Sequence, residues 1–423
     1  MDIVRTYGGI VEKVAIGNPR RAGALIRFGL HAELFRTAYL PDKEMPKAYR
    51  FLNHMAIKEI ADALDKPDSF LWTNIFAPVE LIRSFGLSSI SVEAIASYMS
   101  GFQIEDSLID SCEACGIAST LCSYHKCFIG ACEQGILSAP VGSVTTSMIC
   151  DGNVNTFRYL RDHTGIPSVL LDIPQETTPA TVRYVVEQLE EFVGALERWT
   201  GRSYDEDALK ELLARENRCK ELFLQFLAKR KAHRYPDTLT LRLFMIFATH
   251  LSIGSEWVEE FFQMLADDIE RYPADTGKRL LWVHLTPYAQ PSLARYLNYN
   301  PELSIAVDDF NLDYTEPLDV DHPLEALARK MLDNVYNGPF SRKVDLIEHL
   351  VDEYDIDGVV DFCHWGCKQS AGGVQLIKER MRAKGIPMLV LDGDAIDRRS
   401  SQDGQTRTRL EAFLELLEGG EGR

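Results

Sequence analysis

The sequence predicts an α/β protein built from two duplicated parallel-sheet domains, which a helical connector joins and a helical lead-in precedes. Strand-like and helix-like segments alternate in both halves, which is typical of parallel sheets with right-handed crossovers. Sequence features of the first half recur in the same order in the second half. A chain of 423 residues is also too long for one ordinary core. The expected boundaries are 1–65 for the lead-in, 66–176 for the first domain, 177–272 for the connector and 273–423 for the second domain.

The first half supplies the elements in a regular order. Apolar residues between 52 and 64 recur at helical spacing, so the lead-in is expected to be largely helical. A strand at 70–76 follows, and Pro78 suits the first turn of a short helix that ends at Gly86. Further segments are expected in the order helix, strand, helix and strand, at 121–135, 144–149, 155–163 and 168–172. The connector up to about residue 270 has an almost wholly helical pattern.

The second half repeats this order. A strand around Trp282 echoes the strand around Trp72, 210 residues earlier. The sequence Gly-Ile-Pro opens a strand at 165–167 and again at 385–387. In each half a cysteine-bearing turn after a strand precedes the Gly-Ile-Pro strand by one helix, so the two turns are expected at equivalent sheet edges. Such edges collect ligands in open α/β sheets, and two of them can face one cleft.

Charge and hydropathy exclude several classes of protein. The net charge of −18, without a long Lys/Arg cluster, argues against nucleic acid or an anionic membrane as the main partner. No apolar run reaches the roughly 18 residues that a membrane span needs. The first residues lack the basic and apolar regions of a signal peptide, so the protein is expected in the cytoplasm.

Nine cysteines in a chain without an export signal indicate metal or redox chemistry rather than disulfides. Cys150 directly follows a predicted strand and precedes an Asp-Gly pair, so its thiol is expected to point out of the sheet edge. Cys367 lies where a helix begins, and a thiolate is stabilised there. Cys122 has the same position at the start of the 121–135 helix. We therefore expect these three thiols to be ligands.

The remaining cysteines fit other roles. Cys122, Cys127 and Cys132 are spaced five residues apart, which places successive thiols roughly 140° apart on a helix, so the last two are expected in the core. Cys219 is expected in the core of the connector. Cys112 and Cys115 form a C-x2-C pair, a weak metal signal for which a structural or loop role is favoured. Cys363 fits two roles equally well, a further ligand or the last buried residue of its strand.

Three thiolates from distant segments suit an iron–sulfur cluster better than zinc, because structural zinc usually takes its ligands from local pairs and fills all four positions. A cluster with three cysteine ligands leaves one iron open to an oxygen atom of a substrate.

Several motifs resemble one known family. Residues 362–369 (Phe-Cys-His-Trp-Gly-Cys-Lys-Gln), with 385–387, 391–394 and 408–415, resemble the 2-hydroxyacyl-CoA dehydratase D-component family. That family also contains benzoyl-CoA reductase subunits and double-cubane cluster proteins. Residues 77–81, 121–124, 149–152 and 171–174 resemble its other signatures, so the match covers roughly 65–420. The resemblance implies two Rossmann-like domains around a [4Fe–4S] cluster whose ligands fall on Cys122, Cys150 and Cys367.

The resemblance also implies an activity, that of the iron–sulfur subunit of an anaerobic (R)-2-hydroxyacyl-CoA dehydratase in amino-acid fermentation. Such a lyase eliminates water to a 2-enoyl-CoA through a ketyl radical. It pairs with a homologous second subunit as a heterodimer, and a separate ATP-hydrolysing iron–sulfur activator supplies one electron. The sequence contains no G-x-x-x-x-G-K-[ST] phosphate loop that would let it hydrolyse ATP itself. Glu80, in the family's Pro-x-Glu segment, is the candidate acid/base; a solvated or capping carboxylate is its alternative role.

The extra cysteines keep two alternatives open. If Cys363 closes the fourth iron, the chain is a non-catalytic electron-relay subunit. If more thiols converge, a double-cubane [8Fe–9S] cluster follows, with a homodimeric ATP-dependent reductase of small molecules. The helical spacing of the thiols argues against the second alternative.

Overall fold

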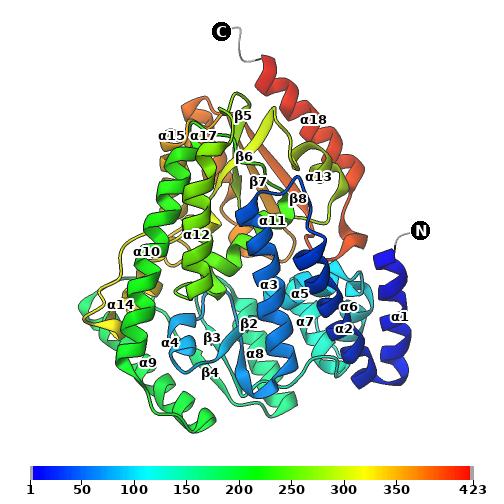
Figure 1. The fold of residues 1–423 in the computed structure, drawn as a ribbon, viewed down its shortest axis with the longest axis vertical. Coiled ribbons are helices and arrows are strands. Elements are labelled where there is room, and N and C mark those ends of the chain that lie inside the picture. Colours follow the sequence, from blue (N-terminus) through cyan, green and yellow to red (C-terminus); the bar gives the residue numbers. More distant parts are fainter. Residues whose placement is uncertain (1–2, 420–423) are drawn as a thin grey trace.

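Two four-stranded parallel sheets form the centre of the protein (Figure 1), in a computed structural model that describes residues 3–419. One continuous hydrophobic core runs through both halves. The predicted α/β fold with N-terminal helices is confirmed. The first sheet has the order β2 (Ser88–Ser91), β1 (Phe70–Thr73), β3 (Gly142–Thr146) and β4 (Ser168–Leu171). The second has the order β6 (Leu303–Asp308), β5 (Lys278–Val283), β7 (Gly358–His364) and β8 (Met388–Gly393).

The two sheets share one topology, because the strands occupy the same places in both orders. The repeated Gly-Ile-Pro sequence has a structural reason. Gly165 ends α8 (Asp151–Thr164) with φ of 72°, and Gly385 ends α17 (Val374–Lys384) with φ of 73°. Glycine adopts this left-handed conformation without the penalty that a side chain brings, so it stops each helix and turns the chain into the next strand.

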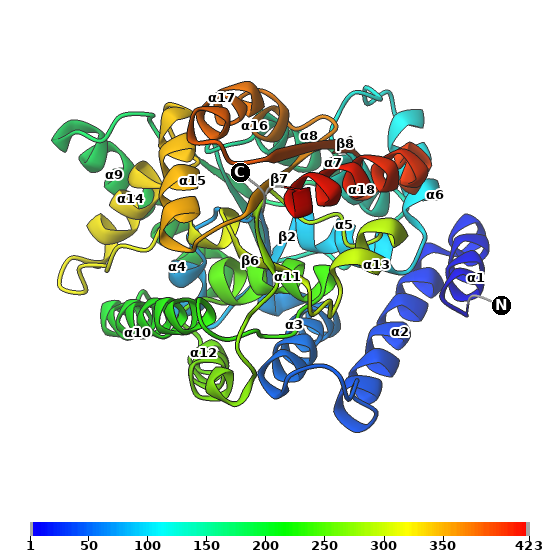
Figure 2. The same cartoon turned by 90° about the horizontal axis from the view of Figure 1, so that it is seen from above.

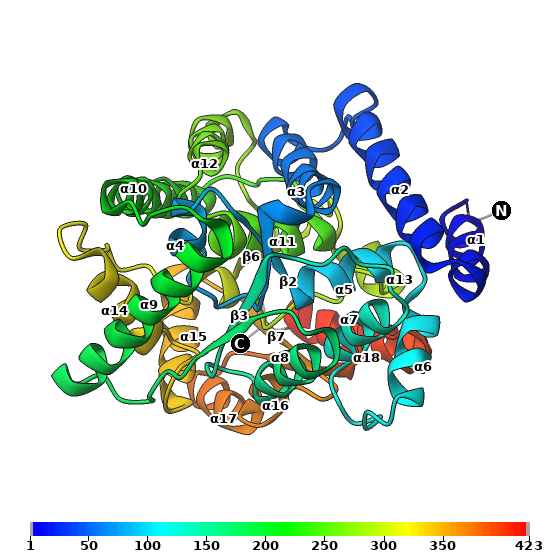
Figure 3. The ribbon, with the colours of Figure 1, turned by 90° about the horizontal axis from the view of Figure 1, so that it is seen from below.

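Helices cover both sheets. Seen from above, α15 (Ser341–Glu353) and α17 pack together on one side of the second sheet. The helices α13 (Pro291–Leu297) and α18 (Asp403–Gly419) pack together on the other side (Figure 2). Seen from below, α7 and α8 lie side by side against the first sheet (Figure 3). The remaining helices of the first half are α4 (Val79–Ser84), α5 (Val92–Gly101), α6 (Glu105–Ala114) and α7 (Ser123–Glu133). Those of the second half are α13 (Pro291–Leu297), α14 (Pro323–Asp333), α15 (Ser341–Glu353), α16 (Lys368–Ala371) and α18 (Asp403–Gly419).

The lead-in and the connector are helical, as the sequence predicts. The lead-in consists of α1 (Ile3–Gly17), α2 (Pro19–Tyr39) and α3 (Lys47–Asp65). The connector consists of α9 (Pro179–Thr200), α10 (Glu206–Arg230), α11 (Leu239–Ile246), the π-helical turn η2 (Phe247–Leu251) and α12 (Glu256–Asp268). In Figure 1, α10 runs along both halves, and it packs against α4 of the first half and α14 of the second. The connector therefore helps to hold the two sheets at a fixed distance.

Some sequence predictions differ from the structure. Strands β2 and β6 were not predicted, because neither segment shows a strong alternation of apolar and polar residues. The strand expected at 144–149 is wrong at its end: β3 stops at Thr146, and Ile149 turns the chain with φ of 61°. A β-branched residue in this left-handed region is strained, and such strain clusters at functional sites. Among residues 3–419, no helix combines the length and apolar character needed to cross a bilayer.

Candidate functional site

The three cysteines singled out by the sequence all occupy helix N-cap positions. Cys122 precedes α7, Cys150 precedes α8 and Cys367 precedes the single turn α16. In none of the three does the sulfur accept a capping hydrogen bond from a backbone N–H group of its helix. For α7 and α8, the free backbone N–H groups and the helix dipole stabilise negative charge on a sulfur at this position.

The cysteine-bearing turns of the two halves touch. Gly366 has φ of 79°, and a Cβ built there would lie 2.8 Å from both the backbone nitrogen and Cα of Cys122. Only glycine allows both this conformation and this approach. Beside the same turn, the Nζ atom of Lys368 lies 2.7 Å from Oδ2 of Asp151, the residue after Cys150. The structure therefore brings together the segments that carry Cys122, Cys150 and Cys367.

Burial and the neighbouring thiols raise the pKa of two of these cysteines, Cys122 and Cys150. Burial raises the pKa of Cys122 far above its ordinary value, and the neighbouring Cys367 and Cys150 raise it further. Burial raises the pKa of Cys150 to about 12, and Cys367 again adds to the effect. Three thiolates at this place require compensating positive charge, which a bound metal supplies.

Each of the three thiols faces a buried histidine. The Sγ atom of Cys122 lies 3.2 Å from Nε2 of His364. The corresponding distances are 3.5 Å from Cys150 to Nε2 of His125, and 3.5 Å from Cys367 to Nε2 of His284. Burial lowers the pKa of His125 to about 4 and that of His284 well below its ordinary value. The two imidazoles are therefore uncharged at neutral pH.

The other cysteines point elsewhere. Cys363 and His364 are neighbours in β7, and successive side chains of a strand point to opposite faces. His364 faces Cys122, whereas the Sγ atom of Cys363 lies 3.6 Å from the carbonyl oxygen of Ser370. The core positions predicted for Cys127 and Cys219 are confirmed, whereas Cys132 is only partly buried and packs against the core. Of the C-x2-C pair, Cys112 is buried in α6 and Cys115 is exposed.

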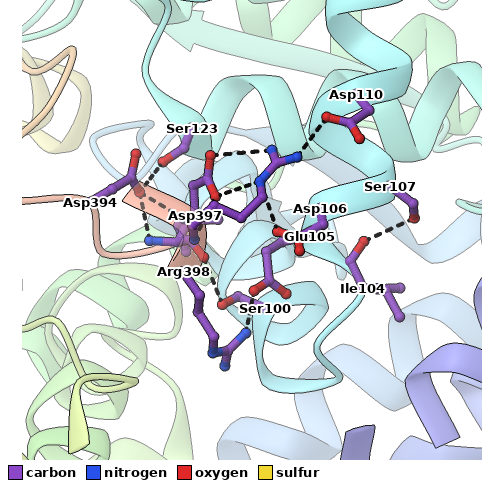
Figure 4. A network of polar contacts seen from close by, with 12 residues as sticks. Ser100, Ile104, Glu105, Asp106, Ser107, Asp110, Ser123, Asp394, Asp397 and Arg398 are labelled. Atoms are coloured by element: carbon purple, nitrogen blue, oxygen red, sulfur yellow. Dashed lines mark hydrogen bonds and ion pairs between the residues drawn. The ribbon is translucent and has the colours of Figure 1, made fainter. Parts of the chain in front are cut away.

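A polar network links Ser123, the residue after Cys122, to the loop after β8 (Figure 4). The hydroxyl of Ser123 donates to Oδ1 of Asp394 at 2.6 Å, and the backbone N–H groups of Ile396 and Asp397 donate to the same oxygen. Arg398, beyond β8, pairs with the buried Glu105 of α6. The loop after the last strand is thus fastened to the helices around the first sheet.

A first cavity lies between the halves and contains Glu80. It has a volume of about 60 Å³, and its lining includes Met148, two residues before Cys150. The Glu80 carboxylate is buried and pairs with Lys330, which also lies 2.7 Å from Glu216 of α10. Burial raises the pKa of Glu80, Lys330 opposes this change, and Glu216 adds to it. A carboxyl with a raised pKa suits proton transfer near neutral pH.

A second and larger cavity, of about 560 Å³, opens between the lead-in helices and the two halves. Its lining includes Glu93, Tyr98 and Tyr124. One carboxyl oxygen of Glu93 and the hydroxyls of both tyrosines are buried without a hydrogen-bond partner. The ring of Tyr124 lies 5.2 Å from that of His364, so this cavity reaches the neighbourhood of Cys122.

Replacing Glu93 by Gln is expected to stabilise the protein at pH 8 but not at pH 4.5. Burial raises the pKa of Glu93 from 4.5 to about 7. The folded state therefore binds this proton more tightly than the unfolded state, and stability falls as pH rises between these values. Removing the carboxyl relieves at most about 3 kcal/mol. Urea unfolding at the two pH values measures the effect, and an equal change at both would contradict it.

Comparison with known proteins identifies the family. Residues 74–417 match the family model described as 2-hydroxyglutaryl-CoA dehydratase, D-component. The chain belongs to this family. The family predicted from the motifs is thereby confirmed.

Members of the D-component family that resemble the chain include the (R)-phenyllactyl-CoA dehydratase alpha subunit of Clostridium sporogenes. It is 22% identical, over 84% of this chain and 91% of its own length. The lactoyl-CoA dehydratase subunit alpha of Anaerotignum propionicum is 21% identical, over 86% and 94%. A benzoyl-CoA reductase subunit of Thauera aromatica is 22% identical, over 80% and 86%. Two of these three relatives are named dehydratases, which are lyases.

The sequence of this D-component chain predicts that the ligand cysteines lie at turns. It does not predict the histidines that face them or the charged partners of Glu80. His125 and His284 have no motif of their own, and His364, in the motif at 362–369, suggests no more than packing against the cluster or a hydrogen bond to it. Lys330 and Glu216 lie far from Glu80 in sequence, so nothing local pairs them. Glu93 follows the unpredicted strand β2, and recognising that strand would have placed it at a sheet edge.

Proposed function

We propose that the chain is the iron–sulfur subunit of an anaerobic (R)-2-hydroxyacyl-CoA dehydratase. It eliminates water from its substrate to give a 2-enoyl-CoA. The observation that carries this proposal is the meeting of Cys122, Cys150 and Cys367 between the two sheets. Membership of the D-component family and the dehydratase names of its relatives support the reaction class.

The donor set fits a [4Fe–4S] cluster. Within residues 3–419, no three Cys, His, Asp or Glu side chains surround one point closely enough to hold a single metal ion. A cluster suits thiolates that do not converge on one point, because each binds a different iron. Cys122, Cys150 and Cys367 would hold three of the four irons. When bound, the cluster supplies a one-electron carrier and an open iron that acts as a Lewis acid.

The orientation of Cys363 supports the catalytic subunit over the electron-relay alternative. Its thiol lies on the face of β7 opposite to His364, and it contacts the carbonyl of Ser370. In this orientation the Cys363 thiol does not lie on the side of β7 from which His364 faces Cys122. With three ligands from the chain, one iron is left for the thioester or hydroxyl oxygen of the substrate.

The reaction passes through a ketyl radical anion of the substrate in this proposal. The thioester carbonyl takes up one electron, the 2-hydroxyl leaves as water after protonation, the β-proton is removed, and the electron is returned. Glu80 is the candidate for the proton transfers, because it lines the first cavity and its pKa is raised. Lys330 orients its carboxylate and restrains that rise.

Two protein partners complete the proposal. The relatives are named as subunits, so a homologous second subunit is expected to form a heterodimer with this chain. A separate ATP-hydrolysing iron–sulfur activator is expected to deliver the first electron. The acyl group of the substrate is set by the cavity walls and by that second subunit.

Anaerobic purification with the co-purifying subunit tests the proposal. Iron and sulfide analysis should give about four of each per chain, as one [4Fe–4S] cluster requires. With an activator and ATP, a panel of (R)-2-hydroxyacyl-CoA thioesters with aromatic, branched and small acyl groups should include one that is converted to a 2-enoyl-CoA. A fully folded protein that binds zinc and never takes up iron would refute the proposal.

The double-cubane alternative makes a different prediction for the same sample. It requires roughly double the iron per chain and activity as a homodimeric reductase rather than as a lyase. Cys112, Cys127 and Cys219 lie inside helices rather than at N-cap positions, which favours the single cluster.

A further inference from the structure

Histidines are unusually placed in this protein. The chain has ten, and among the described residues only four are buried: His125, His250, His284 and His364. Three of these four face the three N-cap thiols, one histidine to each thiol, at Nε2–Sγ distances of 3.2 to 3.5 Å. They come from different elements, α7, the end of β5 and the end of β7. Histidines that served only to fill the core would not be expected to pair one to one with the three thiols.

The ring of His364 is oriented as a donor to sulfur. The backbone N–H of Ala395 donates to its Nδ1 atom at 3.2 Å. An Nδ1 atom that accepts a hydrogen bond carries no proton, so the single ring proton is on Nε2 and points to Cys122. Asp394, the residue before Ala395, is held by Ser123 beside Cys122. Both members of the pair are therefore fixed by the same loop after β8.

The surroundings of the other two rings differ from those of His364. The Nδ1 atom of His125 lies 3.0 Å from the hydroxyl of Thr156, which can donate to it and leave the proton on Nε2. His284 adopts φ of 72°, its backbone N–H donates to Oδ1 of Asp309 at 2.8 Å, and its Nδ1 atom has no partner. His284 is therefore buried with a strained backbone, and its ring makes a hydrogen-bond contact with the Cys367 thiol. Backbone strain of this kind clusters at functional sites, which indicates a function at that thiol.

We propose that His125, His284 and His364 donate N–H···S hydrogen bonds to the three cysteine ligands and thereby raise the reduction potential of the cluster. A hydrogen bond withdraws electron density from sulfur, so the cluster accepts an electron more readily. The effect is large at a buried site, because water does not compete. The three histidines are positioning and tuning residues that act through the sulfurs. The inference rests on the proposed function, since it requires the cluster.

Redox titration of the anaerobic holoprotein, followed by electron paramagnetic resonance, tests the proposal. His364→Leu removes the donor, whereas His364→Gln keeps an N–H near the position of Nε2. The Leu variant should retain its iron, and its reduction equilibrium at a fixed potential should fall about tenfold, which is about 59 mV for one electron. The Gln variant should recover most of this change. His54→Leu, which alters a half-buried ring bonded to Thr37, should leave the potential unchanged.

A second measurement needs no variant. With ¹⁵N-labelled histidine in the wild-type holoprotein, pulsed electron paramagnetic resonance of the reduced cluster should show weak ¹⁵N couplings, as expected across N–H···S bonds. Couplings strong enough for nitrogen bound to iron would overturn the proposal, and so would their absence together with an unchanged potential in the Leu variant. A protein without iron would refute the proposed function instead, so the two failures are distinguishable.

Discussion

Replacing Cys367 by Ser is expected to abolish stable cluster binding, whereas the same change at Cys363, four residues earlier, should leave the cluster intact. The two residues belong to one turn, but only Cys367 faces the other thiols. The Cys367 thiol contacts His284, and its charge acts on both Cys122 and Cys150. The Cys363 thiol contacts the carbonyl of Ser370 on the other face of β7. Iron affinity should fall at least tenfold in Cys367→Ser, since loss even of an outer-shell partner costs about that much.

Iron and sulfide content and the visible absorption of anaerobically prepared protein measure this difference. Far-ultraviolet circular dichroism serves as the control for folding in both variants. Cys150→Ser should behave as Cys367→Ser does, because it removes a ligand from the other sheet. If Cys363→Ser lost its iron while Cys367→Ser kept it, the ligand assignment would be wrong. A changed cluster in both variants would favour the electron-relay alternative, in which Cys363 is a fourth ligand.

The pair of cysteines shows how far sequence alone can reach. Cys367 was predictable because strand-to-helix turns are visible in hydrophobic periodicity, and such turns place a thiol at a helix start. The decision on Cys363 depends on which face of β7 looks into the cleft. That face depends on the packing of β7 between β5 and β8 and on the approach of Gly366 to Cys122. Neither contact has a local signal in the sequence.

The fold was predictable for a related reason. Long amphipathic helices such as α10, and glycine stops such as Gly165 and Gly385, are local features that survive in any context. Strands β2 and β6 were missed, because four to six residues without strong alternation become strands only when a neighbour pairs with them. The positions of β2 and β6 therefore depend on their pairing with β1 and β5 and not on local sequence alone.

The environment of Glu80 leads to the second large expected effect. Glu80 and Glu216 are almost fully buried, with 1% and 0% of their side chains exposed. Lys330 binds both carboxylates, and Lys220 adds a contact of 3.0 Å to Glu216 alone. Although burial alone would raise it, Lys220 and Lys330 hold the pKa of Glu216 below its ordinary value. Removing Lys330 leaves two buried carboxylates and one cation, Lys220, which contacts only Glu216.

Lys330→Met is therefore expected to destabilise the protein by about 3–5 kcal/mol at pH 8, the usual cost of breaking a buried ion pair from one side. The pKa of Glu80 is already raised, and loss of its cation raises it further, so protonation relieves the repulsion at low pH. The penalty should accordingly shrink toward pH 5. Adding Glu80→Gln to Lys330→Met should restore part of the stability at pH 8. Urea unfolding at both pH values measures these differences.

The exposed pair of Lys210 and Glu206, at 2.7 Å on α10, provides the matched control. Lys210→Met should leave stability nearly unchanged, because solvent screens a surface pair. A penalty for Lys330→Met that is the same at both pH values would show that packing of the lysine stem, rather than charge, holds the cavity wall. A pH-independent penalty would also mean that Glu80 does not titrate between pH 5 and pH 8, which would contradict its proposed role in proton transfer.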